Sequence, residues 1–321
     1  MGLFDGIFGK KKEPVKQFSD EPAEDETTVS SDTKKRLSAL MVEMNKRMLT
    51  STQLKLTPVR RASSVYSSKL GGTPYFPRTM EYPRVKTGEC AGEPLFFLAQ
   101  LNFADMPHIE GFPEKGILQF FAGSESDDVV GVDFDDGTNQ NGFRVFYHSE
   151  PFLEEGQLLS ASEIPVPSEE HFGFPFKGEF ALEVGQPEQV SLSTCDYRFE
   201  PLVVESYNAV FGTSYENVWL YQPNAIAKTD SALIDEAYKV CISENCAGTK
   251  IGGFPFFTQY DPRGENQNRR DYGVLLFQLD SSGDGEDEII WGDCGVANFF
   301  ISEKDLAALD FTKVLYNWDC C

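Results

Sequence analysis

A short turn pattern occurs twice in this chain, in segments that lie far apart. Each copy has a lysine, an apolar residue, two glycines, one further residue and a proline, followed by aromatic residues. Two more matches follow in the same order, at nearly the same offset. Collinear matches of this kind predict a duplicated unit whose loops have changed in length. The matched segments are 69–76 with 250–257, 100–101 with 278–279, and 116–121 with 295–300.

The duplication constrains the fold of the whole body. It predicts one domain over residues 51–321, built from pseudo-symmetric halves at about 54–190 and 191–321. An interface between two such halves is a natural place for a cleft. Chance recurrence of common strand and turn residues is the competing interpretation.

The repeated element is interpreted as a rigid structural turn. Glycine allows a positive φ or a close backbone approach, and proline fixes the direction in which the chain leaves. The phosphate-binding patterns G-x-x-x-x-G-K-[ST] and G-x-G-x-x-G do not occur, so neither a nucleotide nor another cofactor is predicted. The turn residues are Gly71, Gly72 and Pro74 in the first copy and Gly252, Gly253 and Pro255 in the second.

Short aromatic strands and few helices indicate a mixed or antiparallel α+β fold. Strands and helices do not alternate regularly, which argues against a doubly wound parallel sheet. Strands are predicted at 94–103, 116–122, 143–148, 178–184, 272–280, 288–292, 295–301 and 311–318. Helices are predicted at 201–211, 230–246 and 303–309, the last opened by a capping box of Ser302 and Asp305.

The N-terminal region is predicted to have two parts. Residues 1–31 form a flexible tail and linker, within which the apolar and lysine-rich segment 1–12 is either a frayed end or a weak membrane-surface contact. Residues 32–50 form an amphipathic helix, capped by Asp32, with a leucine and methionine stripe and a basic opposite face. We expect this helix to dock on the body. Binding of a partner by the same helix is the alternative.

The charge of the chain is strongly acidic and unevenly spread. There are 28 Lys and Arg against 51 Asp and Glu, for a net charge of −23. Residues 1–61 carry 12 basic and 9 acidic side chains, so the rest of the chain holds the whole acidic excess. Such a surface repels nucleic-acid phosphates and speeds encounter with a basic protein. We therefore predict no nucleic-acid binding and a basic protein partner; carboxylates that merely keep a phenylalanine-rich protein soluble are the simpler explanation.

A search for catalytic and metal-binding patterns gives little. The seven cysteines are scattered, as expected of reduced thiols in the cytoplasm, and the spacing of Cys241 and Cys246 exceeds that of a C-x-x-C knuckle. The three histidines show no zinc-binding spacing. A calcium-loop pattern that begins at Asp280 fails at its twelfth position, which is Trp291 where a bidentate glutamate is needed. No metal site is predicted.

One group of polar and aromatic residues is a candidate ligand-binding set. Its members lie beside the second repeated turn or in and next to the matched strands, and they are predicted to line the cleft between the halves. A structural Asp–Arg pair is the commoner use of such residues. The set is Gln100, Gln259, Asp261, Arg263, Gln278, Trp291 and Asp293.

Four segments give the chain a resemblance to a known family. They are KLGGTPYFP from Lys69, KIGGFPFFTQYDPR from Lys250, WGDCGVANFFIS from Trp291 and the ending VLYNWDCC. Together they resemble the YwqG-like family of bacterial proteins, a domain of unknown function, over roughly residues 35–321. The resemblance implies an intracellular fold with an internal duplication and, for some members, a setting near bacterial toxin systems. It implies no reaction and no catalytic residues.

Two functions from different classes follow. The first is a cytoplasmic binding or adaptor protein whose acidic body engages a basic partner, in a toxin-immunity or secretion-system setting. The alternative is an enzyme or a small-ligand-binding protein with a cleft between the two halves. Nothing in the sequence gives the oligomeric state.

Overall fold

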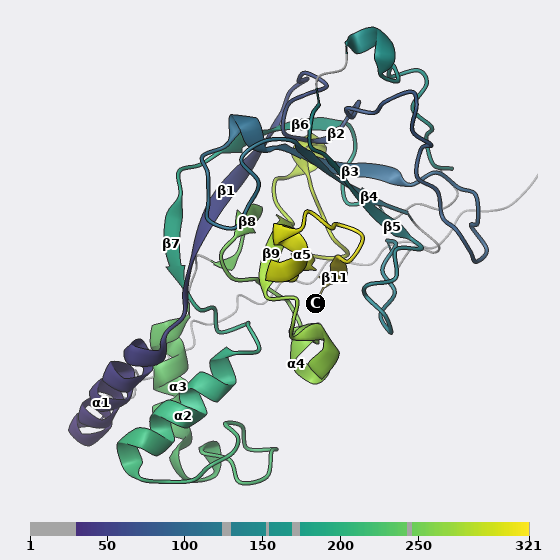
Figure 1. The fold of residues 1–321 in the computed structure, drawn as a ribbon. Helices are drawn as coiled ribbons and strands as arrows, with labels where there is room; N and C mark the ends of the chain where they lie inside the picture. Colours follow the sequence, from purple (N-terminus) through teal and green to yellow (C-terminus); the bar gives the residue numbers. More distant parts are fainter. Residues whose placement is uncertain (1–29, 124–129, 152–153, 169–173, 243–245, 321) are drawn as a thin grey trace, which may run out of the picture.

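The fold is α+β, with a strand-rich antiparallel sheet that curls into a half-barrel and a separate group of helices (Figure 1). A computed structural model describes residues 30–123, 130–151, 154–168, 174–242 and 246–320. The predicted tail at 1–12 and most of the linker lie outside these residues. Among the described residues, no helix combines the length and apolar character that crossing a bilayer requires.

A single sheet contains all the named strands. Its order is β11-β10-β9-β8-β1-β6-β2-β3-β4-β5, and β7 pairs with β1 outside this path. The strands are β1 (Thr50–Arg60), β2 (Lys69–Gly71), β3 (Phe96–Asn102), β4 (Ile117–Ala122), β5 (Phe143–His148), β6 (Glu179–Val184), β7 (Glu188–Ser191), β8 (Lys250–Gly252), β9 (Val274–Asp280), β10 (Val296–Ile301) and β11 (Leu315–Asp319).

Strand β1 joins the two sides of the sheet. Its first part pairs with β7 and β8, with Leu54 opposite Ile251, and its second part pairs with β6, with Leu56 opposite Val184. The strands β2 to β5 then follow on one side and β8 to β11 on the other. The sheet is continuous only because this strand, which precedes the first matched segment, bridges the two runs.

The main core lies inside the curled sheet. Strands β4 and β10 are buried along their whole length, which explains why their sequences are mostly apolar rather than alternating, with Gln119 and Asn298 as the polar positions. Phe120 of β4 meets Phe277 of β9 and Phe299 of β10, with ring centroids 4.9 and 4.7 Å apart. Aromatic contacts therefore join the two sides of the curled sheet, β4 on one side and β9 and β10 on the other.

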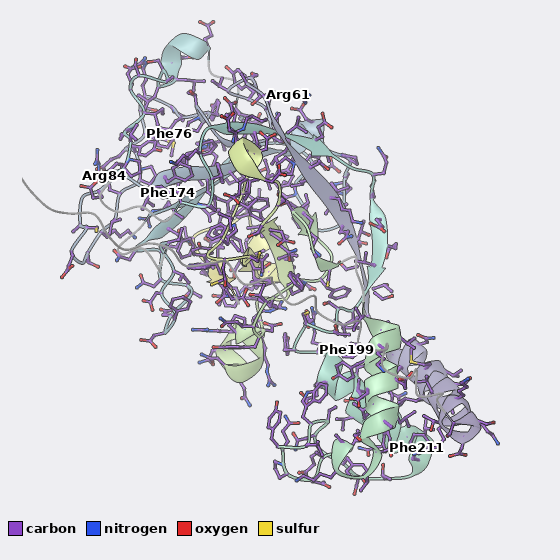
Figure 2. All side chains as sticks on the ribbon, turned by 180° about the vertical axis from the view of Figure 1, so that it is seen from behind. Arg61, Phe76, Arg84, Phe174, Phe199 and Phe211 are labelled. Atoms are coloured by element: carbon purple, nitrogen blue, oxygen red, sulfur yellow. The ribbon has the colours of Figure 1, made fainter. Side chains whose placement is uncertain are left out.

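Three helices pack together away from the sheet. They are α1 (Ser31–Arg47), α2 (Phe199–Phe211) and α3 (Ala227–Cys241), and Figure 2 shows Phe199 and Phe211 within this group. Leu40 and Met44 of α1 are fully buried in a second apolar cluster formed with α2 and α3. The helices α4 (Pro262–Glu265) and α5 (Glu303–Ala307) lie beside the strands.

Several predicted elements are confirmed and two details are wrong. The strands at β3, β4, β5, β6, β9, β10 and β11 are present, and Ser302 and Asp305 form the capping box of α5. The segment 288–292 is not a strand, because only Ile289 makes an isolated bridge, to Ser282. The cap of α1 is Ser30 rather than Asp32, since the Ser30 hydroxyl accepts the Thr33 N–H at 3.0 Å.

The two Gly-Gly turns are built in the same way. Lys69 Nζ donates to the carbonyl of Thr73 at 3.0 Å, and Lys250 Nζ donates to that of Phe254 at 2.7 Å. Both lysines are almost fully buried, at 1% and 0% exposure. Each lysine side chain therefore closes the loop that follows its own strand.

Candidate functional site

A wide groove lies between α2, α3 and the loop before α4. Its volume is about 1110 Å³, and all its lining residues fall between 194 and 270. Aromatic side chains form much of its wall, and two of them are well exposed, Tyr221 at 84% and Tyr260 at 57%. The groove thus belongs to the second half of the chain rather than to the boundary between halves.

Charged groups surround these rings. Glu200, Glu205 and Glu216 line the groove, together with Arg198 and Arg270. The guanidinium of Arg198 is already bound to the Asp196 carboxylate, and Arg270 donates to the carbonyl of Gly264 at 3.1 Å. The accessible wall is consequently acidic and aromatic.

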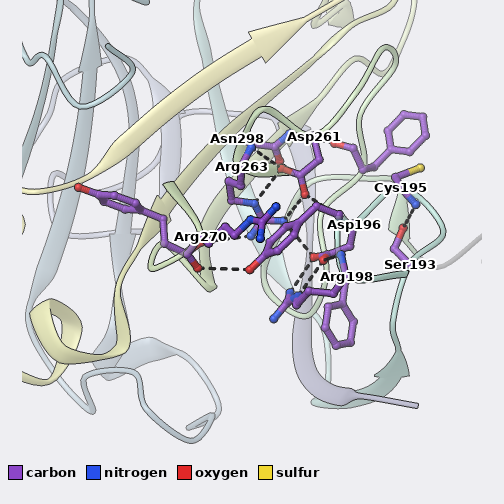
Figure 3. A network of polar contacts seen from close by, with 12 residues as sticks. Ser193, Cys195, Asp196, Arg198, Asp261, Arg263, Arg270 and Asn298 are labelled. Carbon is purple, nitrogen blue, oxygen red and sulfur yellow. Dashed lines mark hydrogen bonds and ion pairs between the residues drawn. The ribbon is translucent and has the colours of Figure 1, made fainter. Parts of the chain in front are cut away.

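The floor of the groove is a buried ionic network (Figure 3). Arg263 donates from Nε and Nη2 to Asp261 at 2.9 and 2.7 Å, and from Nη2 to Asp196 at 2.9 Å. The Arg263 side chain is fully buried and lies over the Phe300 ring, 4.2 Å from its centroid. A bidentate arginine shared by two carboxylates fixes the loops that carry them.

A short repeated pattern positions both carboxylates. In Asp196-Tyr197-Arg198 and in Asp261-Pro262-Arg263, the aspartate accepts the backbone N–H of the arginine two residues later, at 3.0 Å in both cases. It also accepts that arginine's Nε, so each tripeptide is a closed ring of hydrogen bonds. Asp261 caps α4, where Pro262 occupies the first turn.

The surroundings of Asp196 and Arg263 favour their charged forms. Burial disfavours the charge on Asp196, but the hydrogen bonds from Arg198 and the charge of Arg263 outweigh it and hold the pKa of this carboxyl below its usual value. Burial likewise opposes the charge on Arg263, and its bonds to Asp261 raise the pKa of the guanidinium. Groups that satisfy one another so fully form a rigid support and are poor candidates for proton transfer.

The predicted ligand-binding residues are only partly brought together. Gln259 and Asp261 line the groove, and Arg263 lies directly beneath it. Gln259 is held by its N–H, which donates to Asp319 at 2.7 Å. Trp291 is buried in the main core beside Trp318, with 5.8 Å between ring centroids, whereas Asp293 is exposed on the turn that follows.

Gln100 and Gln278 brace the two repeated turns. The side-chain oxygen of Gln100 accepts the N–H of Tyr75, and that of Gln278 accepts the N–H of Phe256, both at 2.9 Å. Each amide nitrogen donates to two carbonyls of the loop before the lysine. These side chains are buried, and their hydrogen bonds support the turns rather than face the groove.

A half-buried histidine extends the first of these networks. Gln119 donates to Tyr75 and Gln100, so its oxygen accepts from Nε2 of His148 at 2.9 Å. Burial lowers the pKa of His148 to about 4.

The low pKa of His148 predicts a pH-dependent stability. The unfolded chain, with a histidine pKa near 6.5, takes up a proton that the folded chain refuses, so stability is complete above about pH 6.5 and is lost as the pH falls toward 4. The loss amounts to about 3 kcal/mol at most. Urea unfolding of the wild type and of His148→Gln between these pH values measures it; equal slopes for the two proteins would contradict the assignment.

A second cleft lies where the predicted interface between halves was expected. Its volume is about 670 Å³, and it is lined from the first half by Glu110 and Phe112 and from the second by Gly252 and Gly253. Its lining contains neither histidine nor cysteine. In the described chain, no cluster of three or more His, Cys, Asp or Glu side chains is suited to hold a metal ion.

Asp196 and its neighbours were not among the predicted site residues. The available signal was the D-x-R string, present at both 196–198 and 261–263. Nothing in the sequence indicates that these strings, more than sixty residues apart, share one arginine.

Comparison with known proteins gives a family but no activity. No curated protein matches the chain. A family model described as a domain of unknown function, DUF1963, matches residues 68–320, which include the groove, the ionic network and both repeated turns. Because this match spans most of the chain, the protein belongs to the DUF1963 family of domains of unknown function.

Proposed function

We propose that this protein is a binding module that holds a basic segment of a partner protein in the groove between α2, α3 and the α4 loop. The observation that carries the proposal is the combination, in one groove, of exposed aromatic rings and the carboxylates of Glu200, Glu205 and Glu216. Lysine and arginine side chains bind aromatic faces by cation–π interaction and bind carboxylates by charge. One extended basic peptide would satisfy both kinds of group.

The net charge of the molecule favours the same partner. A charge of −23 attracts a basic protein over several ångströms and accelerates encounter, while the groove supplies the specific contacts. The rigid Asp196–Arg263–Asp261 floor means that little conformational entropy is lost when the groove is filled.

The proposal includes the setting that the sequence suggests. The YwqG-like resemblance implies a bacterial cytoplasmic protein near toxin or secretion systems, where a basic partner would be neutralised or delivered. Lys69 and Lys250 make equivalent hydrogen bonds, each within its own turn, and so do Gln100 and Gln278. These equivalent contacts support a duplicated unit. A small-ligand or enzymatic role is the alternative. The cleft between the halves supports this alternative, and Glu110 and Glu303 are the acidic residues in its lining.

Removing one exposed ring and one carboxylate from the groove is expected to weaken the binding of a basic peptide about tenfold or more. The variant Tyr221→Ala with Glu216→Gln removes one exposed ring and one carboxylate, and buried tyrosines of interfaces each contribute on the order of 2 kcal/mol. The measurement is fluorescence anisotropy with labelled peptides of equal length and graded positive charge. Affinity should also fall steeply when salt rises from about 0.05 to about 0.5 M.

A matched control separates the groove from the general acidity of the surface. Phe134→Ala with Glu89→Gln removes another exposed ring and another carboxylate outside the groove, and should leave peptide affinity unchanged. Equal losses in the two variants would show binding by net charge alone. Affinity for neutral peptides equal to that for basic ones would reject the proposal.

A further inference from the structure

One wall of the groove is a compact loop whose two ends are hydrogen-bonded to each other. This 216–227 loop connects α2 to the start of α3. Compact surface loops with joined ends hold a fixed shape and are frequently functional. The backbone bonds that join the ends run from Glu216 N–H to Asn224 at 3.1 Å, from Ile226 N–H to Asn217 at 2.9 Å and from Ala227 N–H to Val218 at 2.9 Å.

The tip of the 216–227 loop holds apolar side chains in solvent. Trp219 N–H donates to the side-chain oxygen of Gln222 at 2.9 Å, and Gln222 N–H donates back to the Trp219 carbonyl at 3.0 Å. The two residues between them, Leu220 and Tyr221, are 62% and 84% exposed. Neighbouring apolar side chains that a tight turn fixes in water indicate a docking surface, because little conformational entropy is lost when a partner covers them.

Trp219 is connected to both helices of the groove. Its ring centroid lies 4.8 Å from that of Tyr238 in α3, and Tyr238 lies 5.1 Å from Phe199 in α2. Glu200, which follows Phe199, accepts through Oε1 the N–H of Val218, which precedes Trp219, at 3.2 Å. Two aromatic rings and a carboxylate held by a backbone N–H are thereby brought to the same part of the groove wall.

We propose that Trp219, Tyr238 and Glu200 form an anchor site for one arginine side chain of the basic partner. This inference rests on the proposed binding of a basic segment and adds which cation the groove selects. A guanidinium is planar, so it stacks on an aromatic face while its edge donates to a carboxylate, and it is less strongly hydrated than the ammonium of lysine. Tryptophan forms the strongest cation–π contacts of the aromatic side chains.

Arginines of this chain already use the same combination. Arg36 lies over the ring of Phe211, 4.8 Å from its centroid, while its guanidinium donates to Asp230. Arg263 likewise lies over an aromatic ring while it donates to Asp261. In each case one guanidinium binds a ring and a carboxylate at the same time. At the anchor site, the arginine would come from the partner.

The first experiment compares two peptides of equal length and equal positive charge, one with arginines and one with lysines. Fluorescence anisotropy with the full-length chain should show about fivefold tighter binding of the arginine peptide. Equal affinities would overturn the anchor site and leave the proposed function standing. Absence of any salt-sensitive binding of either peptide would remove the proposed function itself.

Glu200→Gln tests the carboxylate without removing the oxygen that accepts the Val218 N–H. We expect it to lower the affinity for the arginine peptide about tenfold and to bring the two peptides to nearly equal affinity. Glu205→Gln is the matched control, because it removes the same charge from an exposed position of the same helix and groove. It should weaken both peptides equally. If it abolished the arginine preference as well, the assignment of the anchor to Glu200 would be wrong.

Trp219 reports directly whether its ring is covered. The other two tryptophans, Trp291 and Trp318, are buried in the main core, so acrylamide quenches mainly the emission of Trp219. The saturating arginine peptide should reduce this quenching, and Trp219→Phe, checked for folding by circular dichroism, should lose the response together with the arginine preference. Quenching of Trp219 that is unchanged at saturation would place the peptide elsewhere and overturn the proposal.

Discussion

Replacing Arg263 by methionine should lower the free energy of unfolding by about 3 to 5 kcal/mol. The substitution keeps an unbranched apolar stem but leaves the carboxylates of Asp196 and Asp261, which are both buried, without their shared partner. Asp196 keeps Arg198, so Asp261 bears most of the cost. Urea unfolding followed by circular dichroism gives the value.

Two controls define the origin of that loss. Arg270→Met, at an exposed position of the same groove, should change stability by less than about 1 kcal/mol. Combining Arg263→Met with Asp196→Asn and Asp261→Asn should recover part of the loss, because no uncompensated charge is then buried. If Arg263→Met and Arg270→Met were equally stable, the network would contribute nothing beyond packing.

Alanine at the first glycine of either repeated turn should cost roughly 3 to 5 kcal/mol. Gly71 and Gly252 have φ values of +59° and +66°, and an added Cβ would lie 2.2 Å from the carbonyl oxygen of Gly178 and 2.4 Å from that of Thr52. Both obstacles are backbone atoms, one directly before β6 and one in β1, so the sheet itself must move. Thermal and urea unfolding of the two variants measure the cost.

Gly212 is the matched control for this effect. It has the same φ of +66°, at the end of α2, but open space where a Cβ would be. Gly212→Ala should therefore cost only the conformational part, about 1 to 2 kcal/mol. A loss at Gly252 no larger than that at Gly212 would show that the close approach between strands relaxes easily.

The sequence was informative where local pattern and tertiary environment agree. Strands β4 and β10 are buried on both faces, so each is apolar at five of its six positions, a pattern that indicates a buried strand. Strand β1 was missed because its residues are largely polar and include Pro58, which is disfavoured in a central strand. The three-residue strands β2 and β8 owe their existence to their neighbours.

The site could be predicted only in part, for the same reason. Asp261 and Arg263 are two residues apart and visible as a pair, but their link to Asp196 depends on the loops of the folded chain. Trp291, singled out for its motif, turned out to be a core residue because the aromatic side of its turn faces Trp318.

The bridging position of β1 has a consequence for how the protein is made. Leu54 of β1 is synthesised about 200 residues before its partner Ile251 of β8. The edge of β1 that pairs with β8 therefore stays unpaired through most of synthesis. Contacts of such long sequence separation slow folding and expose nascent strands to aggregation. A fragment cut to the family boundary at residue 68 lacks the strand altogether. Recombinant production should therefore retain residues 50–67 and favour slow synthesis at low temperature.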